Sequence, residues 1–132
     1  MTDMKYAYPA IFTKEGSAYS VIFPDLEIAT SGESITEAMS MAEDALCLTL
    51  YDMEQRKVEI PKATDIEEVK HEDGSFVNYI TCDTLAYRMK CDSRAVRKTV
   101  SLPAWLNDIA DRQNISCSAV LREALKKELN IA

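Results

Sequence analysis

The stretch VRKTVSLPAWL, residues 96–106, decides how the C-terminal part of this chain folds. Its first part alternates between apolar and polar side chains, and this alternation predicts a β-strand with one apolar face. The apolar face carries Val96, Val100 and Leu102, and the polar face carries Arg97, Thr99 and Ser101. Pro103 fits the first position of a helix, because the N–H that it lacks would have no partner there. The stretch therefore predicts a strand that leads directly into a helix.

Two short helices are predicted after this strand. The first turns Leu106, Ile109 and Ala110 inward and ends near Asn114. Ser116 is a residue type that caps helix N-termini, so it is expected to begin the second helix. The inward face of the second helix consists of Val120, Leu121, Ala124, Leu125 and Leu129. The C-terminal residues thus form a strand–helix–helix unit.

Such a unit is too small to bury its own apolar faces. So short a segment buries little apolar surface, and a single strand leaves its N–H and C=O groups without ladder partners. Both problems disappear if two copies of the chain pair their strands and interlock their helices. The residues expected in the core of that dimer are Val100, Leu102, Leu106, Ile109, Val120, Leu121 and Leu125.

The N-terminal part predicts a small antiparallel sheet. Residues 4–13 and 18–23 are rich in apolar and aromatic side chains, and turn-forming residues around Gly16 separate them, which is typical of a hairpin. A short third strand is expected over residues 26–31. Residues 76–81 alternate again and are expected to rejoin the sheet.

A long amphipathic helix is predicted to begin after Ser34. Ser34 and Glu37 have the spacing of a capping box, in which the serine hydroxyl accepts from the third helical N–H. The predicted inward face consists of Ile35, Ala38, Met39, Ala42, Ala45, Leu46, Thr49 and Met53. A helix of this kind packs across one face of a small sheet, so the fold class is predicted to be α+β.

The remaining segments connect these elements. Residues 55–75 are predicted to form a charged loop with a short helical piece over 64–69 and a turn at Asp73-Gly74. A second short helix, capped by Asp83, is expected over residues 83–90. The expected domains are 1–90 and 96–132, joined by a linker at 91–95.

Charge is distributed unevenly along the chain. Residues 1–93 carry 8 Lys and Arg against 18 Asp and Glu, a formal charge of −10, whereas residues 94–132 carry 7 against 4, a charge of +3. An acidic body suits a basic protein partner and repels nucleic acid, while a basic tail can approach phosphate.

Several classes of protein are disfavoured by what the chain contains. No apolar run approaches the roughly 20 residues that span a bilayer, so a cytoplasmic protein with no membrane partner is expected. The four cysteines, Cys47, Cys82, Cys91 and Cys117, have no C-x-x-C spacing. We therefore expect reduced thiols, no metal site and no cofactor.

An enzyme is also disfavoured. The predicted strands over 4–13 and 18–23 contain no Asp or Glu, which removes the ligand positions that two-metal nuclease chemistry would need. No phosphate-binding, zinc-protease or nucleophile-elbow motif occurs. The one histidine, His71, lies in a charged loop and is expected to be exposed. No catalytic residue is predicted.

The C-terminal pattern resembles the ribbon-helix-helix repressors. The matching residues are KTVSLPAWL at 98–106 and SCSAVLREAL at 116–125. In that family a two-stranded ribbon enters the major groove. The resemblance implies that Arg97, Thr99 and Ser101 contact bases. It also implies that the helix start at Ser116, Cys117 and Ser118 holds a phosphate through its N–H groups.

The N-terminal part resembles the HicB antitoxin family. The resemblance rests on YPAIF at 8–12, YSVIFPDL at 19–26, GESITEA at 32–38 and AEDAL at 42–46. LAYR at 85–88 and Val96-Arg97 also resemble the connector of family members that carry a ribbon-helix-helix tail, so the resemblance covers nearly the whole chain. One departure is Glu27-Ile28-Ala29, where family members usually have a Pro-Gly-Cys turn. The turn here must therefore be made without glycine.

The resemblance implies a partial ribonuclease-H-like domain without nuclease activity and a HicA-type toxin as partner. Toxins of that type are small basic ribonucleases that cleave messenger RNA with a histidine, and the antitoxin domain covers their active surface. The implied function is neutralisation of the toxin and repression of the chain's own operon by a homodimer on operator DNA; whether dimers associate into tetramers is left open.

Two alternatives remain at this point. The chain could be a stand-alone dimeric ribbon-helix-helix repressor whose N-terminal domain senses a small ligand. It could also be an adaptor without DNA binding, in which case Arg97→Ala would change nothing measurable. A neighbouring gene for a small, strongly basic, histidine-containing protein would favour the antitoxin.

Overall fold

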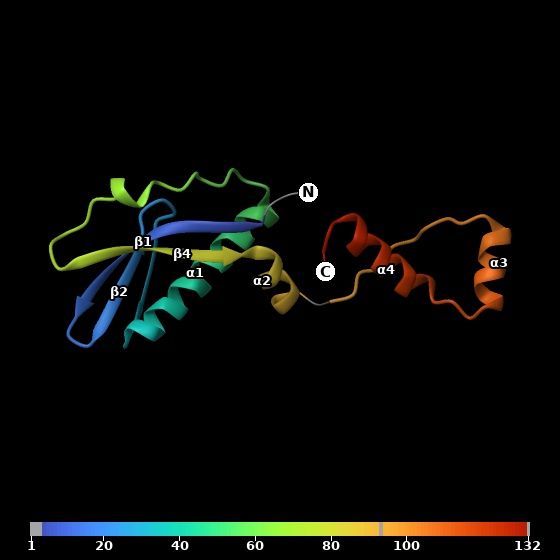
Figure 1. The fold of residues 1–132 in the computed structure, drawn as a ribbon, viewed down its shortest axis with the longest axis horizontal. Coiled ribbons are helices and arrows are strands. Elements are labelled where there is room, and N and C mark those ends of the chain that lie inside the picture. The colour runs from blue at the N-terminus through green and yellow to red at the C-terminus, as the bar shows by residue number, and fades with distance from the viewer. Residues whose placement is uncertain (1–3, 93, 132) are drawn as a thin grey trace. The chain divides into compact units, whose positions relative to one another are not determined.

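The computed structural model describes residues 4–92 and 94–131, and the α+β class predicted from the sequence is confirmed. The described residues divide into two compact units, 4–92 and 94–131 (Figure 1). The N-terminal unit contains β1 (Lys5–Glu15), β2 (Ala18–Phe23), β3 (Ile28–Gly32), α1 (Ile35–Arg56), a 3-10 turn η1 (Ile66–Glu68), β4 (Ser75–Asp83) and α2 (Thr84–Cys91). The C-terminal unit contains α3 (Ala104–Arg112) and α4 (Cys117–Glu128).

The four strands form one antiparallel sheet in the order β3-β2-β1-β4. β1 and β2 form the expected hairpin, with Gly16 in the left-handed conformation at the turn. The register places Phe12 between Val21 on β2 and Phe76 on β4, and the rings of Phe12 and Phe76 stack with centroids 5.1 Å apart. β4 thus rejoins the sheet beside β1, as predicted.

The turn before β3 is made by a non-glycine residue. Glu27 adopts φ 54°, the left-handed conformation that glycine takes at least cost. The N–H of Leu26 donates to the carbonyl of Phe23 at 3.3 Å, which closes the preceding turn. β3 therefore begins at Ile28, two residues later than predicted.

α1 crosses one face of the sheet (Figure 1), and its predicted start is confirmed. The N–H of Glu37 donates to Ser34 Oγ at 3.1 Å. The predicted inward face is partly wrong, because Ile35 is 40% exposed whereas Cys47 and Leu50 are buried. The buried side of the helix is rotated toward Cys47, since Cys47 faces β4.

The core lies between α1 and the sheet. It consists of Tyr8, Ala10, Phe12, Val21, Phe23, Ala38, Ala42, Leu46, Cys47, Leu50, Ile80 and Cys82. β3 approaches the start of α1 so closely that a Cβ on Gly32 would lie 2.7 Å from Ala38 Cα and 2.8 Å from the Glu37 carbonyl carbon. Only glycine fits at that position.

Two of the cysteines correct the sequence-based expectation. Cys47 on α1 and Cys82 on β4 form a disulfide, with Cα atoms 5.5 Å apart, where reduced thiols were expected. The residues are 35 positions apart in the sequence, and only the packing of α1 on the sheet brings their buried side chains together. Cys91 and Cys117 are free and exposed.

The loop after α1 is tied to the sheet by polar contacts. The buried Tyr8 hydroxyl donates to the carbonyl of Pro61, and the N–H of Thr64 donates to the Asp25 carboxylate at 3.0 Å. Burial raises the pKa of Tyr8, and the negative charge of Asp25 raises it further.

η1 and the turn at Asp73-Gly74 form where a helical piece and a turn were predicted.

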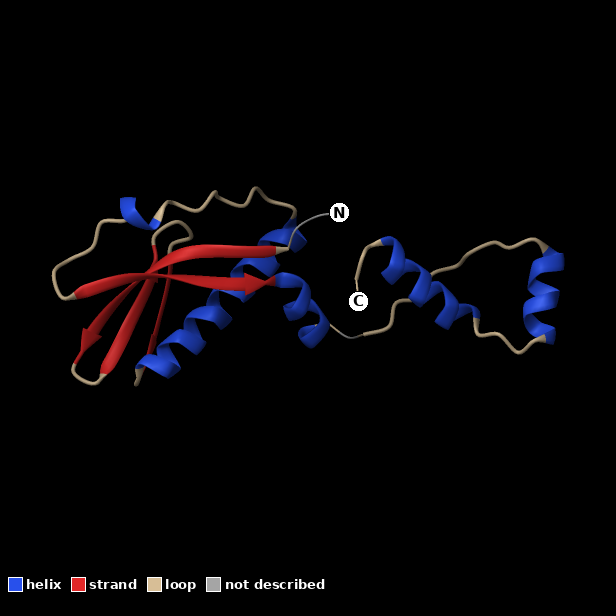
Figure 2. Cartoon of the chain, in the orientation of Figure 1, coloured by secondary structure: helices blue, strands red, loops and turns tan. Residues whose placement is uncertain are grey.

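The C-terminal unit follows its prediction in the helices but not in the strand. Residues 94–103 form neither helix nor strand and appear as loop in Figure 2. A strand needs a hydrogen-bonded neighbour, and no segment of the described chain pairs with these residues. Pro103 precedes α3 as its N-cap instead of occupying the first helical position.

The ends of α3 and α4 share one capping arrangement. Asn114 is left-handed at φ 54°, and the N–H of Ile115 donates to the carbonyl of Ala110 at 3.0 Å. Asn130 is left-handed at φ 57°, and the N–H of Ile131 donates to the carbonyl of Lys126 at 2.8 Å. Both are Schellman caps, which satisfy carbonyls left open at a helix end.

Candidate functional site

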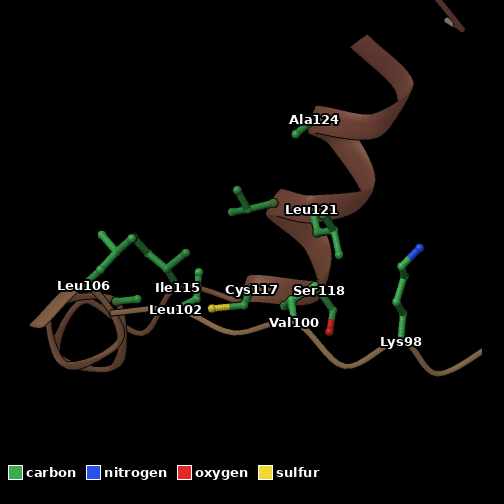
Figure 3. A pocket seen from close by; sticks show the side chains of 11 residues that line it. Lys98, Val100, Leu102, Leu106, Ile115, Cys117, Ser118, Leu121 and Ala124 are labelled. Atoms are coloured by element: carbon green, nitrogen blue, oxygen red, sulfur yellow. The ribbon is translucent and has the colours of Figure 1, made fainter. Parts of the chain in front are cut away.

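An apolar groove of about 500 Å³ lies between the segment 98–102 and the two helices of the C-terminal unit (Figure 3). It is lined by Lys98, Val100, Leu102, Leu106, Ala110, Ile115, Cys117, Ser118, Val120, Leu121 and Ala124. We call it the C-terminal groove. Apart from Lys98 and Ser118, the side chains that line it carry no strongly polar group, so water in the groove finds few hydrogen-bonding partners there.

The C-terminal groove brings together most of the residues predicted for a dimer core. Val100, Leu102, Leu106, Val120 and Leu121 line it. Ile109 and Leu125 do not; they are 47% and 49% exposed elsewhere on α3 and α4. The unit therefore presents apolar side chains both inside the groove and outside it.

Ile115 is a groove residue that the sequence analysis missed. It directly precedes the N-cap Ser116, and Val120 is the fourth residue of α4. Apolar residues at these two positions form a hydrophobic staple that sets how the chain enters a helix. That spacing is the signal that could have identified Ile115.

Alternate residues of the segment before α3 differ in what they line. Lys98, Val100 and Leu102 line the C-terminal groove. Arg97, Thr99 and Ser101 are exposed and do not line it. Successive side chains of this segment therefore alternate between the groove and solvent, as they would in the predicted strand, although the segment forms no ladder of hydrogen bonds with another strand of the described chain.

The start of α4 has the chemistry of an anion-binding helix end. Ser116 Oγ accepts from the N–H of Ala119 at 3.2 Å and so caps the helix. Cys117 and Ser118 occupy the first two helical positions, where N–H groups have no acceptor within the helix. Their side chains line the C-terminal groove, so any anion would be held by the backbone at this end.

The C-terminal unit has no core of its own. Within residues 94–131 no residue is buried. Leu102, Leu106 and Leu121 are 45%, 40% and 36% exposed. Burying one leucine side chain fully is worth about 1.5–3 kcal/mol, so the unit leaves a large stabilisation unrealised in a single chain.

A polar cluster joins α2 to α1 in the N-terminal unit. The Glu54 carboxylate accepts from Tyr6 Oη at 2.7 Å, from Thr84 Oγ1 at 2.9 Å and from Arg88 Nη2 at 2.6 Å. The Arg88 guanidinium also lies 5.1 Å from the centre of the Tyr51 ring. Desolvation raises the pKa of Tyr87 on α2, and the nearby Cys91 and Asp44 add to the effect. The three hydrogen bonds to Glu54 tie β1 and α2 to α1, whereas the buried Nε of Arg88 has no hydrogen-bond partner among the described residues.

Three further features of the described part of the chain bear on its function: the grouping of possible metal ligands, the single histidine, and the length and apolarity of the helices. No three His, Cys, Asp or Glu side chains there are grouped to hold a metal ion. His71 is exposed, and its Nδ1 lies 2.9 Å from Ser75 Oγ. None of the described helices is long and apolar enough to cross a membrane.

Comparison with known proteins places these features in a family. A family model described as HicB-like antitoxin of bacterial toxin-antitoxin system matches residues 8–126. A solved toxin-antitoxin complex from Streptococcus pneumoniae contains a chain that is 26% identical, with a TM-score of 0.60 over 95% of this chain and 99% of that one. No curated protein matches the chain.

Two further structures share the fold at lower identity. The antitoxin HicB from Burkholderia pseudomallei is 20% identical, with a TM-score of 0.51 over 96% of this chain and 97% of that one. Antitoxin HicB3 is 18% identical, with a TM-score of 0.51 over 96% and 99% of the two chains. Each match extends over both units of this chain.

Proposed function

The chain belongs to the HicB-like antitoxins of bacterial toxin-antitoxin systems, and on that premise we propose that it neutralises a cognate toxin and represses its own operon. It is an antitoxin and not an enzyme. The observation that carries the two-part proposal is the contrast between the units: one has a closed core and an acidic surface, while the other exposes an apolar groove beside basic residues.

The N-terminal unit binds the toxin in this proposal. The partner is a HicA-type toxin, a small basic ribonuclease whose active surface the unit covers. The formal charge of −10 on residues 1–93 supports this arrangement, because opposite charges on two surfaces speed association and favour the right partner. We assign the β1–β2–β3–α1–β4 order to a partial ribonuclease-H-like domain. The similar chain from Streptococcus pneumoniae comes from a toxin-antitoxin complex.

The C-terminal unit dimerises in this proposal as a ribbon-helix-helix domain. Two copies pair residues 96–102 as an antiparallel ribbon, which supplies the strand partner that one chain lacks. The second copy also covers the C-terminal groove and the exposed Ile109 and Leu125. The absence of any buried residue over 94–131 supports this step, since a folded domain needs a core.

The ribbon reads operator DNA through Arg97, Thr99 and Ser101. These side chains are exposed and do not line the C-terminal groove, so pairing through the groove leaves them accessible. The α4 start at Ser116, Cys117 and Ser118 holds a phosphate. One ribbon makes few base contacts, so two dimers on adjacent sites are expected at the operator.

Co-purification with the product of the neighbouring gene tests the antitoxin role. A stable complex of a small basic protein with this chain, in which ribonuclease activity is suppressed, is the expected result. If no complex forms while the chain still binds operator DNA, the stand-alone repressor replaces the antitoxin in our proposal.

Paired variants test the DNA-binding role. Arg97→Ala with Thr99→Ala should abolish preference for operator over unrelated DNA in a gel-shift titration, while the chain still neutralises toxin. Lys127→Ala removes one positive charge near the opposite end of α4 and serves as the matched control; it should lower affinity for both DNAs without changing the preference. Equal loss of selectivity in both variants would refute the assignment of the base-reading residues.

Truncation tests the division of labour between the units. A chain ending at Asp92 should neutralise toxin, be monomeric in sedimentation, and fail to bind operator. Normal operator binding by that shortened chain would show that the DNA-binding unit has been placed wrongly.

A further inference from the structure

The outward face of α1 carries a line of acidic and apolar side chains. Glu37, Met41, Asp44, Leu48 and Asp52 follow one another at spacings of three or four residues, which puts them on one side of a helix. All five are exposed. We call them the α1 stripe. It lies opposite the side of α1 that packs on the sheet, where Ala38, Ala42, Leu46 and Leu50 are buried.

The apolar members of the stripe are large and open to solvent. Met41 is 41% exposed and Leu48 is 58% exposed. They are seven residues apart, about 10.5 Å along the helix axis. A single exposed leucine needs no explanation. Two apolar side chains on one line, each flanked by carboxylates, have the make-up of an interface with apolar anchors inside a polar rim.

The charge on α1 selects the kind of partner. α1 contains Glu37, Glu43, Asp44, Asp52 and Glu54, and its only basic residue is Arg56. Glu54 is engaged inward with Arg88 and Asp52 pairs with Arg56 at 2.9 Å, so Glu37 and Asp44 at the start and middle of the stripe carry most of its outward charge. A nucleic acid or a second α1 stripe would be repelled by this surface, whereas a basic protein surface would be attracted.

We propose that the α1 stripe is the surface through which the N-terminal unit binds its toxin, by docking on a basic protein face with apolar hollows for Met41 and Leu48. This inference rests on the proposed function. The main competing surface is the sheet face opposite α1, which exposes Ile22 at 47%. The nearest cross-strand neighbours of Ile22 are Ile11 and Ala29, and neither brings a carboxylate beside it to attract a basic partner.

Matched lysine substitutions in the full chain test the proposal. Leu48→Lys and Ile22→Lys each replace an exposed apolar side chain by a cation, one on the α1 stripe and one on the opposite face. Leu48→Lys should weaken binding to the toxin encoded by the neighbouring gene at least 30-fold, the size of a hot-spot loss. Ile22→Lys should change the dissociation constant less than about threefold. Thermal unfolding of each variant alone checks that the fold is retained.

The charge contribution is tested at a second pair. Asp44→Lys should slow association with the toxin about tenfold at low salt, with the difference shrinking as salt is added. Glu67→Lys, on η1, makes the same change of charge away from the stripe and should have a smaller effect on the association rate.

The outcomes separate this inference from the proposed function. If the unmodified chain binds and inhibits the toxin but Leu48→Lys binds as tightly, or Ile22→Lys loses as much affinity, the α1 stripe is not the docking surface and the antitoxin role stands. If the unmodified chain does not bind the toxin at all, the proposed function fails and the inference fails with it.

Discussion

The two units of this protein differ in whether a single chain buries their apolar side chains. In the N-terminal unit, Phe12, Phe23 and Leu46 are 0% exposed, and a helix on a sheet closes the core within one chain. In the C-terminal unit, Leu102 and Leu121 remain 45% and 36% exposed. The first unit can therefore fold as a monomer, whereas the stability of the second depends on what covers it and hence on protein concentration.

The largest effect is expected where the N-terminal unit is packed most tightly. Gly32→Ala should lower its free energy of unfolding by about 4 kcal/mol, because the added Cβ meets the backbone of α1 at Ala38. Urea unfolding measures the loss. Gly16→Ala is the control: a Cβ there meets nothing within 4 Å, so only the left-handed backbone penalty of about 1–2 kcal/mol applies. Equal losses would show that the β3–α1 approach is not tight.

Leucine truncations compare the units directly. Leu46→Ala should cost about 3 kcal/mol at any protein concentration, because it opens a cavity in a closed core. Leu121→Ala should leave the unfolding of the N-terminal unit unchanged and weaken dimerisation, as measured by sedimentation over a range of concentrations. A concentration-independent effect of Leu121→Ala would contradict a core shared between two chains.

The disulfide strengthens one unit alone. Replacing Cys47 and Cys82 together by alanine should lower the free energy of unfolding of the N-terminal unit by about 2–3 kcal/mol, because the crosslink no longer restricts the unfolded chain. A reducing agent should act similarly on the native protein and leave the double variant unaffected. Cys117→Ala, at an exposed free thiol in the C-terminal unit, is the control and should leave the stability of the N-terminal unit unchanged.

Alkaline pH should weaken the N-terminal unit through Tyr8. Its pKa is raised above the ordinary value of 10.0 by burial and by Asp25, so the folded state holds the phenolic proton more tightly than the unfolded state. The stabilisation is complete below pH 10 and is lost as pH rises through the folded-state pKa. Tyr8→Phe should lose less stability over that range than the unmodified protein when unfolding is followed by circular dichroism.

The smallest effect concerns the turn before β3. Glu27→Gly should raise the free energy of unfolding by about 0.5–1 kcal/mol, because glycine adopts the left-handed conformation at φ 54° without the side-chain penalty. Glu27→Ala, which keeps the penalty, is the comparison. A destabilised Glu27→Gly protein would show that the glutamate side chain makes a contribution of its own.

Local signals were sufficient to place most elements. Ser34, Asp83 and Ser116 each cap the helix predicted to follow it, because a cap bonds to an N–H only two or three residues away. The predicted strand over 96–102 failed within one chain for the converse reason, since a strand requires a partner that no local pattern supplies. Its side-chain alternation survives as the division between groove-lining and exposed residues.

The C-terminal groove and the α1 stripe were harder to predict from the sequence, because both depend on contacts between residues far apart in the chain. The sequence identified five of the groove residues as core, but not Ile115, whose position before an N-cap was the available clue. It indicated an acidic N-terminal unit without showing that Met41 and Leu48 lie outward among the carboxylates. The outward position follows from which side of α1 meets the sheet.

By itself the sequence determined the α+β class, the family, and the presence of each helix and of the four strands in the N-terminal unit, because these follow from interactions within a few residues and from an ordered series of side chains. The tertiary structure decided which distant residues meet: Cys47 with Cys82, and Glu54 with Arg88. It also decided which side of α1 closes the core of the N-terminal unit. Burial depends on the packing of segments far apart in the chain, and no local pattern encodes that packing.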